Sequence, residues 1–154
     1  MLSPRPYYEV LLTMHVFSPV FGAMALLLVS GPALARDSWT STVERGLPVL
    51  SVKTSGGELR LVCDPDRVFG PTSNGAVIVH FPKDATPSTI VFLAKSGEQA
   101  RLAVKNGMAA QAAAGAADWA KMVGILREGG EFAVVSSRDS FTVETAPLPD
   151  LACE

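Results

Sequence analysis

The stretch Leu47 to Cys63, LPVLSVKTSGGELRLVC, indicates the fold class of this chain. Leu50 and Val52 share one face of its first half, and polar residues lie between and after them. Leu59, Leu61 and Cys63 share one face of its second half. A period of two is typical of strands that bury one face, and the Ser-Gly-Gly sequence between the halves favours a turn. The stretch therefore predicts a β-hairpin.

Further strand patterns follow along the chain. Segments 76–81 and 89–94 are apolar at nearly every position, which predicts interior strands covered on both faces. Segment 99–105 alternates again and runs into the Asn-Gly pair at 106–107, a pair that tolerates positive φ. We therefore expect a hairpin whose second strand is 108–113.

One segment has a helical period. Asp118 can cap a helix that begins at Trp119, and Gly129-Gly130 provides its C-terminal stop. The alanines from Ala109 onward favour helix by propensity, so a longer helix that replaces strand 108–113 is the alternative.

A last hairpin is expected between segments 131–136 and 141–145. Together these elements predict a mainly β protein. It is an antiparallel β-sandwich or strongly curved sheet of about seven or eight strands with one helix packed across it.

Residues 1–35 read as a secretory signal peptide. Arg5 precedes the largely apolar run 10–30, and small residues at Ala33 and Ala35 fit the site that signal peptidase cleaves. An uncleaved membrane anchor is the alternative, because the apolar run is long enough to cross a bilayer.

The remaining residues, 36–154, are expected to form one exported domain, periplasmic or secreted. The chain carries 13 Lys and Arg against 15 Asp and Glu, and these charges are interspersed. This balance argues against nucleic acid as a partner, and against a membrane unless the signal segment stays uncleaved. Cys63 and Cys153 both fall in this domain, and an even number of cysteines in an exported chain predicts one disulfide bond.

Residues with catalytic or ligand-binding chemistry are few. His80 is the single histidine of the exported domain, and no nucleophile motif, phosphate-binding glycine loop or set of metal ligands accompanies it. No metal and no cofactor are therefore expected. Asp64 and Asp66 flank a proline and suit a turn, so we expect a possible interaction loop that carries these two residues with Arg67 and Phe69.

The order of features resembles small bacterial periplasmic β-sandwich proteins. The resemblance is carried by Trp39, the strand Leu59 to Cys63, the segment Leu126 to Val134, and Phe141 to Val143 before a terminal cysteine. Two such groups are the invasion-associated locus B family and the periplasmic accessory proteins of type VI secretion. The resemblance implies an accessory or interaction role and supplies no catalytic residues.

The leading hypothesis is a non-enzymatic interaction module that presents a sheet face, a sheet edge or a loop to another envelope or secreted protein. Such a module should show an exposed apolar patch or an unprotected edge. A small hydrolase or hydrolase inhibitor is one alternative, and an enzyme should gather Asp64, Asp66, His80 or Glu98 in a pocket. A lipid or small-molecule carrier is another, and it should show an apolar cavity between sheet and helix.

Overall fold

The structure, a computed structural model, describes residues 37–64 and 75–150. The chain divides into units 1–33 and 34–154, and every described residue belongs to the second unit. The expected signal segment, residues 1–35, lies outside the described residues. Within the described ranges, no helix combines the length and the apolar character needed to cross a membrane.

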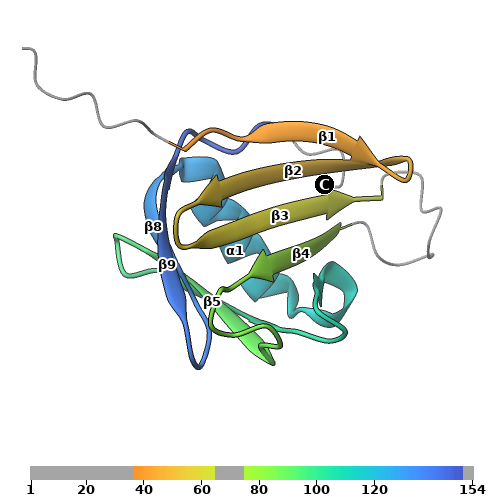
Figure 1. Cartoon of the computed structure of the whole chain (residues 1–154). Helices are drawn as coiled ribbons and strands as arrows, with labels where there is room; N and C mark the ends of the chain where they lie inside the picture. The colour runs from red at the N-terminus through yellow and green to blue at the C-terminus, as the bar shows by residue number, and fades with distance from the viewer. Residues whose placement is uncertain (1–36, 65–74, 151–154) are drawn as a thin grey trace, which may run out of the picture. The chain divides into compact units, whose positions relative to one another are not determined.

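The described residues form two antiparallel sheets and one α-helix, which confirms the predicted fold class (Figure 1). The first sheet has the strand order β1-β2-β3-β4-β7, and the second has the order β6-β5-β8-β9. The elements are β1 (Thr40–Glu44), β2 (Leu47–Thr54), β3 (Gly57–Cys63), β4 (Gly75–His80), β5 (Thr89–Ala94), β6 (Gln99–Ala103), β7 (Ala109–Ala110), the 3-10 helix η1 (Gln111–Ala113), α1 (Ala116–Glu128), β8 (Gly130–Val135) and β9 (Ser140–Thr145).

The predicted first hairpin is present as β2 and β3. Val52 pairs with Leu59, and both side chains are buried. Gly56 in the turn and Gly57 at the start of β3 allow β9 of the second sheet to approach closely. A Cβ atom on Gly56 would lie 2.6 Å from the Cβ atom of Phe141, and one on Gly57 would lie 2.5 Å from its ring. The two glycines therefore permit contact between the sheets as well as the turn.

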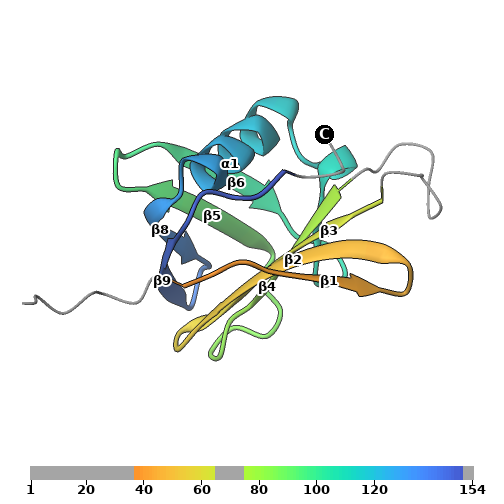
Figure 2. The same ribbon diagram turned by 90° about the horizontal axis from the view of Figure 1, so that it is seen from above.

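The hydrophobic core is shared by both sheets and the helix. Figure 2 shows α1 lying over β5 and β6, on one side of both strands. The helix contacts both of these strands. The helical period of this segment is confirmed, because its apolar residues, which include Trp119 and Leu126, form the buried face of α1. The largest fully buried side chains include Phe81, Phe92, Phe132, Leu59, Leu61, Ile90, Leu102, Met122, Ile125 and Leu126.

The helix ends where it was predicted to end but begins earlier. Gly129 follows the last helical residue with a φ of 67°, a conformation that favours glycine. The prediction that Asp118 caps the helix is wrong, because Gly115 is the N-cap and Asp118 lies in the first turn. Alanine has a high helix propensity, so the helix already begins at Ala116 and includes Ala117.

The expected hairpin after β6 is also wrong, although its turn is present. Asn106 and Gly107 have φ angles of 52° and 79°, and Lys105 and Met108 exchange backbone hydrogen bonds. The chain then leaves β6 and crosses to the first sheet, where Ala109–Ala110 pairs with β4. Ala109 becomes fully buried there, a burial that explains why this short alanine segment pairs with β4.

Strands β4 and β5 are interior strands, but the prediction that both of their faces are covered is wrong. Val77 and Val79 are buried, whereas Ala76 and Ile78 on the other face of β4 are only half-buried. The same alternation occurs in β5, where Val91 and the residues on its face, Thr89 and Leu93, are half-buried. The apolar run in β4 therefore supplies the core and also an outward surface.

Strand β1 was not predicted from the sequence. Its residues, TSTVE, alternate too weakly in polarity to show a buried face, and all five are exposed. It pairs antiparallel with β2 through the short turn at Arg45-Gly46. Trp39, just before β1, packs against the core, and its Nε1 donates a hydrogen bond to the Ala146 carbonyl at 3.1 Å.

Candidate functional site

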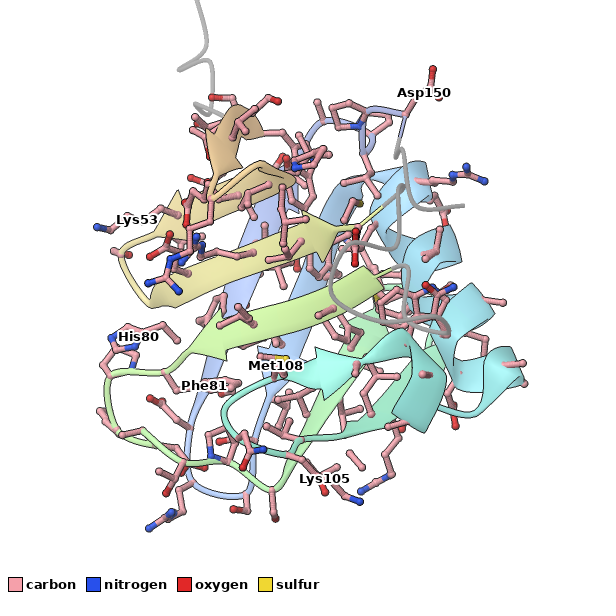
Figure 3. All side chains as sticks on the ribbon, turned by 90° about the vertical axis from the view of Figure 1, so that its right-hand side faces the viewer. Lys53, His80, Phe81, Lys105, Met108 and Asp150 are labelled. Carbon is pink, nitrogen blue, oxygen red and sulfur yellow. The ribbon has the colours of Figure 1, made fainter. Side chains whose placement is uncertain are left out.

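An apolar groove lies on the face of the first sheet that points away from the core. Its volume is about 310 Å³. Figure 3 shows Met108 on this side of the molecule, beside β4, with His80 at the far end of that strand. We call this apolar groove the outer groove. Its lining residues are Leu47, Val62, Asp64, Gly75, Ala76, Ile78, Met108 and Ala110.

The register of the first sheet explains why these residues meet. Val49 pairs with Val62, Val62 with Ala76, and Ala76 with Ala110. Residues directly opposite each other share a face of the sheet, so these four side chains form one row across four strands. Ile78 belongs to the next row and lies opposite Arg60. The groove is therefore built mainly by strand pairing, and Asp64 and Met108 join it from outside the strands.

A second depression of about 370 Å³ continues the outer groove toward the β1–β2 turn. It shares Leu47, Val62, Ile78 and Met108 with the groove, and charged residues form its rim. On that rim the Arg60 guanidinium forms an ion pair with the Glu44 carboxylate.

The apolar side chains of the groove remain partly accessible. Met108 is 41% exposed, and Val62 and Ile78 are half-buried. Exposed apolar surface bordered by charged residues is typical of sites that bind protein segments or apolar ligands. The arrangement can therefore bind an apolar group and orient its polar neighbours at the rim.

The described candidates for catalysis are not brought together. Asp64 lines the outer groove, next to the β3 end at which Cys63 pairs with Gly75. His80 is exposed at the other end of β4, and a strand of this length spans about 17 Å. Glu98 lies in the turn between β5 and β6 of the second sheet.

Several predicted site residues lie outside the described residues. These are Asp66, Arg67 and Phe69 of the possible interaction loop, and Cys153 of the expected disulfide bond. Cys63 is buried at the end of β3. The loop and the bond therefore remain predictions.

Polar residues also gather near the His80 end of β4. They come from the segment that follows β4 and from the β8–β9 turn. The Asp84 side chain is fully buried and accepts a hydrogen bond from Arg138 Nη2 at 2.9 Å. Asp139 accepts one from the Lys83 amide at 2.8 Å. These contacts fasten two turns together. In residues 37–64 and 75–150, no group of three His, Cys, Asp or Glu side chains could hold a metal ion.

Sequence patterns do not predict the outer groove, because its residues come from four strands, the residue that follows β3 and one turn. The unbroken apolar run Ala76 to Val79 is the available signal, but by itself it predicts a strand covered on both faces. Comparison with family models, with curated proteins and with solved structures finds no match to this chain.

Proposed function

We propose that this protein is a non-enzymatic, exported binding module that captures an apolar segment of another envelope or secreted protein in the outer groove. The observation that carries the proposal is the partly accessible apolar row that Val62, Ala76 and Ala110 form across β3, β4 and β7. Protein interfaces commonly place one or two large apolar anchors in such a pocket and surround them with a polar rim. Arg45 and Glu44 supply that rim here.

Export is part of the proposal and rests on the sequence. Residues 1–35 have the pattern of a signal peptide, and Cys63 and Cys153 are suited to an oxidising compartment. The resemblance to periplasmic β-sandwich proteins points to the same role. We place the protein in the periplasm or among secreted proteins, with the cysteines joined.

A lipid or small-molecule carrier is the second candidate, because the aliphatic lining of the groove also suits a hydrocarbon chain. The space between sheet and helix, where such a ligand was expected, is occupied by core side chains such as Met122 and Leu102. A hydrolase gains no support among the described residues, because Asp64, His80 and Glu98 occupy separate places.

The proposal can be tested with displayed random peptides selected for binding to the protein. Ile78→Lys places a charge in the groove, and Val91→Lys is the matched control. Both residues are β-branched, half-buried and outward-facing on interior strands. We expect selected peptides to bind Ile78→Lys at least about tenfold more weakly than the unmodified protein, and Val91→Lys with unchanged affinity.

Thermal unfolding of both variants verifies that they remain folded. Peptides that bind Ile78→Lys as well as the unmodified protein would contradict the proposal. Titration with oleate tests the second candidate, a lipid carrier. Groove-dependent oleate binding without any selected peptide would favour the carrier.

A further inference from the structure

Strand β1 forms one edge of the first sheet, at the top of the view in Figure 1. Among the described residues, β2 is its single strand neighbour. Exposed edges are usually protected by lysine, proline or a bulge. The five residues of β1, TSTVE, include neither lysine nor proline, and their pairing with β2 is regular from Thr40 to Glu44.

The other described edges are shorter or covered. Strand β7 has two residues. Strand β6 lies against α1, and the Arg101 amide donates a hydrogen bond to the Asp118 carboxylate at 3.4 Å. Strand β9 has a bridge to Asp37 at its C-terminal end, where the Asp37 amide donates to the Glu144 carbonyl at 2.7 Å, and the stretch from Ser140 to Val143 that remains is shorter than β1. In the described part of the chain, β1 therefore offers the longest open edge.

The β1–β2 turn determines which backbone groups of β1 face outward. A two-residue turn makes its flanking residues, Glu44 and Leu47, a hydrogen-bonded pair. The pattern alternates along an antiparallel strand, so Thr42 also bonds to β2. The N–H and C=O groups of Ser41 and Val43 consequently point away from the sheet.

We propose that these groups bind β1 of a second copy of the chain, antiparallel and across a twofold axis at Thr42. Ser41 then lies opposite Val43 of the second copy, and each such pair exchanges two hydrogen bonds. The match is self-complementary because the outward-pointing residues lie symmetrically about Thr42. Pairing also covers the Val43 side chain, which is 73% exposed.

Charge is compatible with this register. Glu44 is the single charged residue of β1, and pairing about Thr42 places it opposite Thr40 of the second copy rather than opposite another carboxylate. Its carboxylate is already paired with Arg60 of its own sheet. Like charges directly opposite each other would destabilise a strand pair, and none arise here.

The pairing joins two five-stranded sheets edge to edge. Thr42 continues the row that contains Val49 and Val62, so both outer grooves open on the same side of the joined sheet. A contact of five residues per copy is smaller than a standard protein interface, and the dimer is therefore weak. The inference does not depend on what the grooves bind.

The test measures molecular mass against concentration, up to about 1 mM, for protein expressed from the complete coding sequence. We expect reversible dimerisation. Val43→Pro removes an outward-facing amide and leaves the bonds to β2 in place, so it should weaken the dimer at least about tenfold. Val43→Ala is the matched control that keeps the amide, and it should weaken the dimer less. A monomer at every concentration, or a dimer unaffected by Val43→Pro, would overturn the proposal.

Cross-linking tests the register. Thr42→Cys faces itself at a site where opposite Cα atoms are close enough for a disulfide, so oxidation should give a covalent dimer. Thr40→Cys faces Glu44 of the second copy and should cross-link much less. The reverse order would overturn the pairing about Thr42. Protection of the Ser41 and Val43 amides in a monomer would also overturn it, because another segment would then cover the edge.

Discussion

Gly129 is the residue at which the helix ends and the chain reverses into β8. Its φ of 67° and ψ of −157° belong to a region that is essentially restricted to glycine. A Cβ atom there would lie 2.6 Å from the backbone nitrogen of Pro147. The C-terminal segment uses this close approach, and the Leu148 amide donates a hydrogen bond to the Leu126 carbonyl at 2.9 Å.

Two glycine substitutions near this point should have opposite effects. Gly129→Ala combines backbone strain with a steric clash and should lower the free energy of unfolding by about 2 to 4 kcal/mol. Gly124→Ala is the control, because Gly124 lies in the helix and an added Cβ would meet nothing within 4 Å. It should raise the free energy of unfolding by about 0.5 to 1 kcal/mol. Chemical denaturation measures both, and equal effects would contradict the assignment of Gly129.

At the scale of elements, two turns have similar positive φ angles at different residues. Arg45 and Gly46 have φ angles of 51° and 84°, and Asn106 and Gly107 have 52° and 79°. Asparagine adopts positive φ more readily than arginine does. The β1–β2 turn therefore carries a small strain that the other turn avoids.

Exchanging the first residues of these turns should move stability in opposite directions. Arg45→Asn should raise the free energy of unfolding by about 0.5 kcal/mol and slow hydrogen exchange in β1. Asn106→Arg should lower it by a similar amount. Denaturation curves and amide exchange measure these effects, and a stability loss in both variants would show that the Arg45 side chain has a contact of its own.

Local patterns predicted the elements whose signals lie within one segment. The alternation around Val52 and Leu59 predicted the first hairpin, and the glycines after Glu128 predicted the end of the helix. The position of Ala109–Ala110 could not be predicted this way, because it pairs with β4, a strand from a distant part of the chain. The outer groove depends in the same way on register across four strands.

At the scale of the whole molecule, the expected bond between Cys63 and Cys153 would fasten the end of the chain to the first sheet. Cys63→Ser should lower the free energy of unfolding by about 2 to 5 kcal/mol. Replacing both cysteines should cost little more, because the same bond is lost in each case. Thiol titration of the unfolded, unreduced protein should find no free thiol. Two titratable thiols would contradict the bond.

Processing is a second prediction at this scale. The small residues Ala33 and Ala35 predict cleavage before Arg36. Intact-mass measurement of the exported protein should therefore show a chain that begins at Arg36. Full-length protein in a membrane fraction would favour the anchor.

The contacts made by Asp37 and Trp39 have a consequence for the order in which the protein folds. Trp39 bonds to Ala146, which is 107 residues further along the chain. A ribosome or export channel releases the early residues first, so the partners of Asp37 and Trp39 emerge only with the last strand. Hairpins such as β2–β3 can form at once, because their contacts are local. Closure of the domain therefore requires the complete chain. Until translocation ends, Asp37 and Trp39 lack these partners.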